Sequence, residues 1–347
     1  MNEIQVQIRD ASLKQPPADP GLSIIIVTYN SATVLPGLLD SLPAGLEGLE
    51  RFETIVVDND SHDDSVDVAL AHPIRPRVIR MGRNAGYAAA INAGATTVSP
   101  RENLLILNPD LRLYPGAGSL LVDRLSDSSV GVAVPRILNG DGTLSWSIRR
   151  EPSVMTVWAE AIMGGTLAGR IGMGEMVGGP AVYDRESLID WATGAILAVS
   201  SRVRQIVGDW DEKFFLYMEE VDYMRRVREA GFSVAYVPQA KAMHVGGEYR
   251  ENPLLYGLLS ANRIRYHRRH HGPISTAAFR LGIILGEGMR AFRGPPGHRA
   301  AVRAALRPWK LPVWVPTAPL GASGESGSRA SNKPIHSASA AGGKRGR

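Results

Sequence analysis

The chain has 347 residues, of which 44% are hydrophobic, and it carries a formal net charge of +5. This length and apolar content exclude an intrinsically disordered chain and allow one sizeable α/β domain or two small ones. Cysteine is absent, which excludes disulfides, catalytic thiolates and thiolate-bound metals, so any metal needs carboxylate, imidazole, carbonyl or water ligands, as Mg²⁺ and Mn²⁺ accept.

Strands and helices are predicted to alternate through the first third of the chain. Short runs rich in Ile, Val and Leu, bounded by turn residues, indicate buried strands, and the segments between them have helical spacing. The predicted strands are 22–29, 52–57, 77–81 and 103–107, and the predicted helices are 31–41, 65–71 and 86–97. This alternation predicts parallel strands flanked by helices.

Polar residues follow each of these four strands. They are Thr28 with Asn30, Asp58 with Asn59, Arg83 with Asn84, and Asn108 with Asp110. In open parallel sheets, ligands bind beyond the carboxyl ends of the strands. One polar strand end is usually only a turn, whereas four in succession indicate a binding site at that edge.

The second half has a less regular pattern. Strands are expected at 130–135, 144–148, 191–199 and 234–237. Residues 152–176 are expected to form loop and helix, and a helix closed by Gly231 is expected within 214–231. Residues 261–307 are basic and helical in pattern, and the Gly-, Ser- and Ala-rich residues beyond them predict a disordered tail.

Three carboxylates, those of Glu219, Glu220 and Asp222, lie together at the start of the helix that Gly231 closes. They could simply complement the positive end of the helix dipole. Their apolar neighbours, however, would bring them near a buried surface. Burial and like-charge crowding raise a carboxylate pKa toward that of a general base, so the cluster is a candidate catalytic site.

Each remaining candidate has a simpler alternative. Asp110 could bind a phosphate-bridging metal, but Asn-Pro-Asp is also a common turn. His244 is a candidate metal ligand, although a lone histidine is more often structural. Asp58 with Asn59 could bind a base or ribose, or form a turn before a helix. Gly86 would let the backbone approach a ligand closely, or belong to an ordinary turn.

Together these segments resemble the family 2 glycosyltransferases, which have the GT-A fold. The resemblance lies in five segments in the family's order: 24–30, 56–61, 83–92, 105–110 and 217–226. Within the family, the pattern is most similar to bacterial rhamnosyltransferases of cell-wall and surface-polysaccharide assembly. The resemblance covers roughly residues 22–244 and implies a catalytic domain with a mostly parallel central sheet flanked by helices.

The resemblance implies a role for each matched position. The donor nucleotide-sugar would be bound by Thr28, Tyr29, Asn30, Asp58, Asn59, Arg83, Asn84, Gly86 and Asn108. Asp110 would bind Mn²⁺ or Mg²⁺, and His244 would complete the metal's ligand shell. Glu220 would be the catalytic base, with Glu219 and Asp222 beside it.

Two positions depart from the family pattern. Asn108 replaces the first acid of the metal motif, so weaker metal binding is expected. Glu220 occupies a position where aspartate is usual, which changes the reach of the base. Asp222 and Arg226 could instead organise the acceptor side or the fold.

The implied activity is inverting, metal-dependent transfer of a hexose. Rhamnose from dTDP-rhamnose is the expected donor group, with UDP- or GDP-sugars as alternatives. The acceptor would be a hydroxyl of a cell-surface glycan or of a polyprenyl-diphosphate-linked sugar. A role in polysaccharide and cell-wall biosynthesis would follow.

Two other functions are compatible with parts of the pattern. A nucleotidyltransferase would usually have a Gly-rich, Lys- or Arg-bearing signature after the first strand, and residues 27–31 have none. A non-catalytic protein that binds sugar or nucleic acid leaves the acids at 219–222 unexplained. The GxGxxG, GxxxxGK[ST], HExxH and GxSxG motifs are also missing from the sequence.

The expected organisation is a leader at 1–20, a catalytic domain at 21–260, a basic helical extension at 261–315 and a tail at 316–347. The catalytic domain would divide into a donor half (about 21–115) and an acceptor half (about 116–260). Neither a signal peptide nor a run of about 18 apolar residues is visible, so a cytoplasmic location is expected. The basic extension would contact an anionic membrane surface or pack against the domain, and no nucleic-acid partner is expected.

Overall fold

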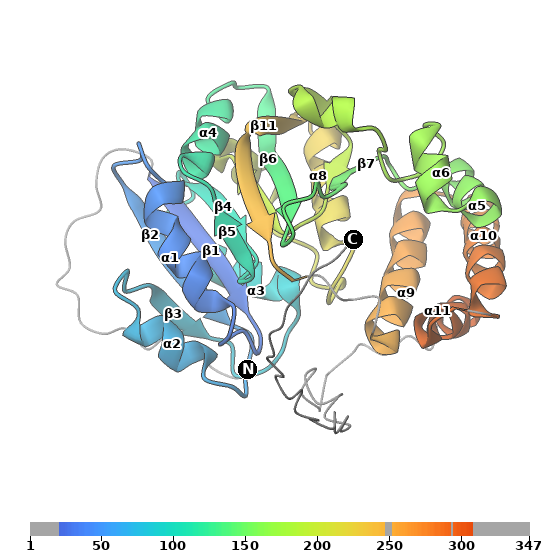
Figure 1. Ribbon diagram of the computed structural model, residues 1–347, viewed down its shortest axis with the longest axis horizontal. Coiled ribbons are helices and arrows are strands. Elements are labelled where there is room, and N and C mark those ends of the chain that lie inside the picture. Colours follow the sequence, from blue (N-terminus) through green and yellow to red (C-terminus); the bar gives the residue numbers. More distant parts are fainter. Residues whose placement is uncertain (1–20, 247–251, 293, 308–347) are drawn as a thin grey trace, which may run out of the picture.

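The computed structural model describes residues 21–246, 252–292 and 294–307 (Figure 1). Within these residues, helices cover both faces of a central β-sheet, and a further group of helices lies beside this unit. The leader at 1–20 and the tail at 316–347 lie outside the described residues.

The central sheet has nine strands. They are β1 (Leu22–Thr28), β2 (Phe52–Asp58), β3 (Arg77–Arg80), β4 (Asn103–Leu107), β5 (Leu111–Leu113), β6 (Val130–Asn139), β8 (Ser187–Ile189), β10 (Ile196–Val199) and β11 (Ser233–His244). Their order is β3-β2-β1-β4-β10-β6-β11-β5, and β8 pairs with β11. Strands β1 to β4 are parallel, as are β6 and β11, whereas β10, β5 and β8 are antiparallel to their partners. The predicted α/β class with a mostly parallel sheet is confirmed.

Both faces of the sheet are buried, because neighbouring residues of a strand point to opposite faces. The helices around the sheet are α1 (Leu35–Gly45), α2 (Ser65–Ala71), α3 (Tyr87–Ala95), α4 (Ala117–Arg124), α7 (Ser201–Val207) and α8 (Glu219–Glu229). Ile24 and Ile26 of β1 belong to the core that includes residues of α1, α2 and α4. Ile25 and Val27 belong to the core that includes residues of α3, α7 and α8. Burial on both faces explains the continuous apolar runs in the sequence.

The strand expected at 191–199 is interrupted. β9 (Trp191–Ala192) pairs with β7 (Ile148–Arg149) in a separate two-stranded sheet, and only β10 joins the central sheet. Between them lies Gly194, where an added Cβ would be only 3.2 Å from the Glu220 side chain. The break therefore brings backbone against one of the predicted catalytic acids, which a continuous apolar pattern does not reveal.

Several other elements differ in length from the prediction. The strand expected at 144–148 is reduced to β7 and an isolated bridge at Leu144. β6 continues to Asn139, and β11 continues to His244 with irregular pairing after Val237. His244 is thus the last residue of a strand. Gly231 does close α8, in a left-handed conformation with φ of 87°.

A second group of helices forms the right-hand side of Figure 1. It consists of α5 (Val154–Met163), α6 (Gly165–Arg170), α9 (Pro253–His270), α10 (Pro273–Ala291) and α11 (Pro296–Leu306), and the 3-10 helix η1 (Pro180–Asp184) follows α6. α9, α10 and α11 each have a proline in the first turn, where its missing N–H costs nothing. Val157, Ile264, Phe279, Ile283 and Ala305 form their small core. Helix α9 runs through residues 260 and 261, at which the sequence places a domain limit, and no helix among the described residues is long and apolar enough to cross a membrane.

The buried His267 of α9 predicts a loss of stability in mild acid. Its ring stacks on Phe279 and His271, with centroid distances of 4.2 Å in both cases. Burial, with the positive charges of His271 and Arg225 adding to it, lowers the pKa of His267 from 6.5 to about 4. Because the folded-state pKa lies below the unfolded one, the stabilisation is present above pH 6.5 and is lost as pH falls toward 4.

We expect this histidine alone to reduce the free energy of unfolding by about 2 kcal/mol between pH 7 and pH 5. Urea unfolding at both pH values measures the change. His267→Gln should remove most of that pH dependence, whereas His62→Gln, at an exposed histidine, should leave it as in the wild type. Equal pH dependence in the wild type and His267→Gln would contradict the prediction.

Candidate active site

A cavity of about 360 Å³ lies at the carboxyl ends of β1, β2 and β4. Six residues that the sequence predicts to bind donor or metal line it: Tyr29, Asn59, Asn84, Gly86, Asn108 and Asp110. Phe215 and Leu216, which precede α8, form another part of its wall. The structure therefore brings four of the five motif regions to one cavity.

Three predicted donor residues brace the loops behind this wall instead. Thr28 Oγ1 donates to Asp58 Oδ1 (3.1 Å), and the Ser61 amide donates to Asp58 Oδ2 (3.1 Å). Asn30 accepts from the His62 amide through Oδ1 (2.8 Å). These bonds tie the loop after β1 to the loop after β2. Arg83, also predicted to bind the donor, does not line the cavity and is exposed to solvent.

Two asparagines fix the wall formed by the loops after β2 and β3. Asn59 Nδ2 donates to Asn84 Oδ1 (2.9 Å), and Asn59 Oδ1 accepts from the Ala85 amide (2.9 Å). Asn84 Oδ1 also accepts from the Gly86 amide (3.2 Å). The two side chains are thereby held at the cavity surface.

Gly86 makes the close approach that its lack of a side chain predicts, but to the protein's own backbone. Its φ is 93°, and an added Cβ would lie 2.3 Å from the Phe215 carbonyl oxygen. The next amide, that of Tyr87, donates to this oxygen (2.8 Å). The cavity wall at Asn84 and Gly86 and the segment that leads to α8 are joined at this point.

Asp110, in the turn before β5, lines the cavity, and His244, the last residue of β11, lies next to Asp110. Leu111, next to Asp110, pairs with His244 in the β5–β11 register. His244 Nε2 lies 3.1 Å from Asp110 Oδ1, yet the angles form no proper hydrogen bond, and both buried atoms lack any other partner among the described residues. At Gly246, an added Cβ would lie 2.2 Å from Asp110 Oδ2.

Two converging, unsatisfied ligand atoms fit a divalent cation whose other ligands are phosphate oxygens and water. The described residues contain no group of three or more His, Cys, Asp or Glu side chains that could bind a metal. The protein would therefore supply only two ligands, and the donor would have to complete the shell.

Glu219 and Glu220 begin α8, and each has one buried carboxylate oxygen without a hydrogen-bond partner in the part of the chain that the structure describes. Burial raises the pKa of Glu219 well above its usual range, and the charge of Glu220 adds to this. Burial also raises the pKa of Glu220 to about 7, against the opposing effect of hydrogen bonds from backbone amides. One carboxyl of the pair can therefore act as a base near neutral pH while the other stays protonated.

Tyr87, which the sequence motifs do not single out, connects the acids with the cavity. It lines the cavity, and its hydroxyl donates to the Gly194 carbonyl (3.4 Å). Burial raises its pKa well above the usual value, and the charges of Glu219, Glu220 and Asp110 add to this. The three carboxylates thus lie within electrostatic reach of one phenol. Its position directly after Gly86 was the available signal.

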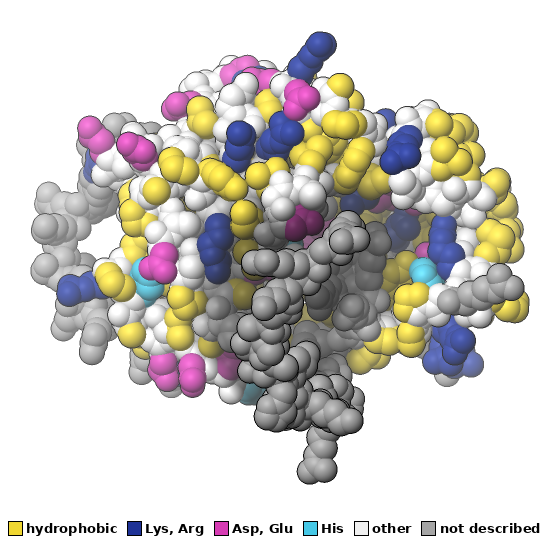
Figure 2. All heavy atoms as spheres, in the orientation of Figure 1, with side chains coloured by type: hydrophobic (Ala, Val, Ile, Leu, Met, Phe, Trp, Pro, Cys, Tyr) yellow, Lys and Arg dark blue, Asp and Glu magenta, His cyan; other side chains and the backbone are white. Residues whose placement is uncertain are grey.

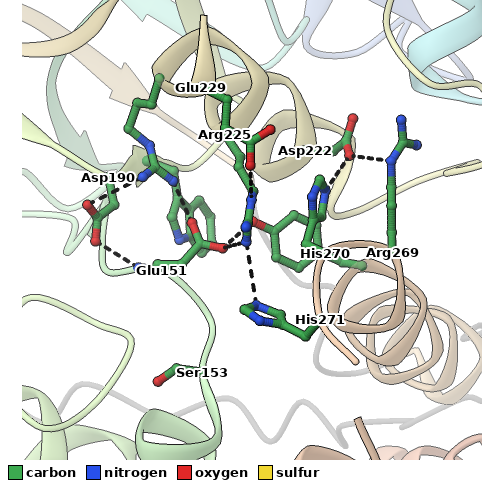
Figure 3. Close-up of polar contacts among 12 residues, drawn as sticks. Glu151, Ser153, Asp190, Asp222, Arg225, Glu229, Arg269, His270 and His271 are labelled. Atoms are coloured by element: carbon green, nitrogen blue, oxygen red, sulfur yellow. Dashed lines mark hydrogen bonds and ion pairs between the residues drawn. The ribbon is translucent and has the colours of Figure 1, made fainter. Parts of the chain in front are cut away.

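Asp222 lies in a different cluster (Figure 3). It is fully buried and accepts hydrogen bonds from Arg226 Nε (2.8 Å) and His270 Nε2 (3.0 Å), and Arg269 pairs with it. Burial disfavours its charge, but the bonds from His270 and Arg226 outweigh this and lower its pKa. The carboxylate joins α8 to α9, which agrees with the alternative that Asp222 and Arg226 organise the fold.

The sequence of this chain is similar to those of known glycosyltransferases. The model of the family described as Glycosyl transferase family 2 matches residues 23–191. An N-acetylglucosaminyl-diphospho-decaprenol L-rhamnosyltransferase of Mycobacterium tuberculosis is 27% identical over 234 residues, which cover 64% of this chain and 75% of that protein. A low-salt glycan biosynthesis hexosyltransferase, Agl10 of Haloferax volcanii, is 28% identical over 229 residues, covering 64% of this chain and 66% of that protein.

Solved structures show the same fold at low sequence identity. The mannosyltransferase PcManGT of Pyrobaculum calidifontis, in complex with GDP-Man and Mn²⁺, matches with a TM-score of 0.53 and 13% identity, over 84% of this chain and 87% of that chain. GalNAc-T7, with UDP, GalNAc and Mn²⁺, matches with a TM-score of 0.51 and 14% identity, over 72% of this chain and 48% of that chain. The fold is therefore the GT-A fold of these glycosyltransferases. The match to glycosyl transferase family 2 covers residues 23–191, just under half of the chain, and the sequence relatives above are glycosyltransferases by name.

The contact at Gly86 predicts that even a methyl group there is damaging. Gly86→Ala would strain a positive φ and overlap the Phe215 carbonyl, whereas Gly82 has a φ of 66° and open space around it. We expect Gly82→Ala to lower the free energy of unfolding by about 1 kcal/mol and Gly86→Ala by about 2 kcal/mol more. Urea unfolding of both variants tests this, and equal losses would show that the close approach carries no cost.

Proposed function

We propose that this glycosyltransferase is an inverting, metal-dependent enzyme that transfers rhamnose from dTDP-rhamnose to a glycan or polyprenyl-diphosphate-linked acceptor. The observation that carries the mechanism is the Glu220 carboxyl: it does not line the cavity itself, but its charge acts on Tyr87, which does, and burial raises its pKa to about 7. The similarity to a rhamnosyltransferase whose name specifies a diphospho-decaprenol acceptor supports the donor and the acceptor.

In the proposed reaction, Glu220 removes the proton from the acceptor hydroxyl. The hydroxyl oxygen bonds to the anomeric carbon while the bond from that carbon to the diphosphate oxygen breaks. A single displacement from the opposite face inverts the anomeric centre. Glu219, whose pKa burial raises well above its usual range, stays protonated in this proposal and limits the negative charge that the acids present to the diphosphate.

The donor would lie along the cavity wall formed by Tyr29, Asn59 and Asn84. Asp110 and His244 would hold Mn²⁺ or Mg²⁺ there, and the ion would supply positive charge to the leaving nucleoside diphosphate. Asn108 replaces the first acid of the motif, so the metal would bind weakly until the donor's phosphates are present. A binding protein without catalysis would have no use for two carboxyls of raised pKa next to the cavity-lining Tyr87.

The helices beside the catalytic unit carry an exposed apolar surface, which we name the apolar edge. Its exposed side chains on or next to α5, α6 and α10 are Met155, Ile162, Leu167, Ile171, Ile274, Leu281, Leu285, Met289 and Phe292. Figure 2 shows hydrophobic side chains gathered along the right-hand side, where these helices lie in Figure 1. An apolar surface of this extent usually marks an interaction site.

We infer that the apolar edge rests on an anionic membrane surface, because of the charge around it. Residues 252–292 and 294–307 contain nine arginines and one acid, Glu287. Arg170 is exposed between Leu167 and Ile171, and Arg299 reaches the end of α10. Apolar side chains with flanking arginines suit a bilayer interface that contains acidic lipids, where a polyprenyl-linked acceptor resides.

The activity prediction concerns donor, metal and base together. The purified protein is incubated with dTDP-, UDP- and GDP-sugars and a short-chain polyprenyl-diphosphate sugar, with and without Mn²⁺ or Mg²⁺, and nucleoside diphosphate release is measured. We expect metal-dependent release from dTDP-rhamnose, with a rate that rises through about pH 7 as Glu220 loses its proton. Glu220→Gln should lower kcat by at least about 100-fold with donor binding retained, and Glu50→Gln, on the surface, should not. A fully active Glu220→Gln enzyme would contradict the assignment of the base.

The apolar edge is tested by vesicle co-sedimentation of the whole protein. We expect binding to vesicles with phosphatidylglycerol and weak binding to pure phosphatidylcholine. Replacing Leu281, Leu285 and Met289 by Glu should reduce binding at least about tenfold, because each loses its apolar contact and adds a charge. The control replaces Leu188 and Ile206 by Glu; both lie outside the apolar edge and are at least as exposed as the three residues tested. If the apolar edge instead joins two copies of the chain, the triple variant will change the mass in solution and leave vesicle binding unchanged.

A further inference from the structure

The turn before the catalytic acids has an unusual backbone. Tyr217 and Met218 have φ of 69° and 74°, the left-handed region that side chains other than glycine's rarely adopt. Met218 is also the N-cap of α8, so this turn sets the direction in which the helix starts. A strained turn of this kind persists only when its surroundings hold it.

Asn262 of α9 holds this turn from outside α8. Its Nδ2 donates to the Leu216 carbonyl (2.9 Å) and to the Tyr217 carbonyl (3.3 Å), and the side chain is 1% exposed. The opposite amide orientation would point Oδ1 at two carbonyl oxygens, so the two acceptors fix the orientation. Its Oδ1 is buried without a partner among the described residues. Asn262 therefore stabilises the turn through the two hydrogen bonds that its Nδ2 donates.

Helix α9 is itself fixed against α8, as Figure 3 shows. Asp222 of α8 binds His270 and Arg269 of α9. On the same side, Glu151 accepts hydrogen bonds from both Arg225 of α8 and Tyr266 of α9. These contacts hold α9 against α8 and thereby keep Asn262 within hydrogen-bond distance of the turn.

We propose that Asn262 is a positioning residue for the catalytic base. By holding the Leu216 and Tyr217 carbonyls, it fixes the turn from which Glu220 starts and keeps Phe215 and Leu216 in the cavity wall. The proposal rests on the role of Glu220 proposed above. It gives Asn262 of α9 a part in catalysis. This part is separate from any contact that the neighbouring helices make with a membrane.

The test compares Asn262→Asp and Asn262→Ala with the wild type in the full chain. Aspartate keeps the shape but has no N–H to donate, so we expect both variants to lower kcat by about 10- to 100-fold with the donor KM changed by less than about threefold. The pH at which the rate rises should also move from about 7, because the surroundings of Glu220 change. Ser260→Ala is the matched control, since this buried hydroxyl on α9 donates to the Tyr256 carbonyl of its own helix and, among the described residues, to no other group.

A second variant separates positioning from general stability. Glycine adopts a φ of 69° without strain, so Tyr217→Gly should make the turn less dependent on Asn262. Asn262→Asp should then reduce activity several-fold less in the Tyr217→Gly background than in the wild type. If Asn262→Asp does not fold on its own, Tyr217→Gly with and without Asn262→Asp are compared instead. Wild-type kcat and pH profile in folded Asn262 variants, or equal losses in both backgrounds, would overturn the proposal. If those variants are fully active while Glu220→Gln is inactive, only the positioning role fails; an active Glu220→Gln enzyme removes the base itself.

Discussion

The hydrogen bond from the Tyr87 amide to the Phe215 carbonyl joins the two parts of the site. On one side lie the loops after the parallel strands, which line the cavity. On the other lies the strained turn that leads to Glu219 and Glu220. Only glycine at position 86 lets the two backbones approach this closely. Because the cavity wall and the acids share this contact, the distance between the cavity and the two acids is set by backbone rather than by mobile side chains.

The sequence identified the parts of the fold that depend on local patterns. Strands β1, β2 and β4 are buried on both faces, so their apolar runs mark them within a residue or two. The sequence also named Asp110 and His244 as a metal pair from the family resemblance, and the β5–β11 register brings them together. The metal itself and the roles of both residues stay predictions.

The remaining differences have physical causes that are not local. Gly194 interrupts an apolar run because Glu220, far along the chain, lies against it. Asn262 belongs to a helix that the sequence describes only as basic, and its two acceptors lie more than forty residues earlier. Helix geometry alone predicts that Asp222 points away from Glu220, because residues two apart on an α-helix point about 200° apart. Glu220 and Asp222 therefore face different neighbours, although they are almost adjacent in the sequence.

The order of the strands has a consequence for synthesis on the ribosome. β11 lies between β6 and β5, so β5 has no partner in the sheet until a strand more than a hundred residues later has been made. His244 ends that strand, and the helix with Asn262 follows it. A nascent chain can therefore complete the parallel strands β1 to β4 early, whereas the contact between Asp110 and His244 and the support of the turn before Glu220 form last. If the function proposed above is right, incomplete chains would fold in part without being able to consume nucleotide-sugar.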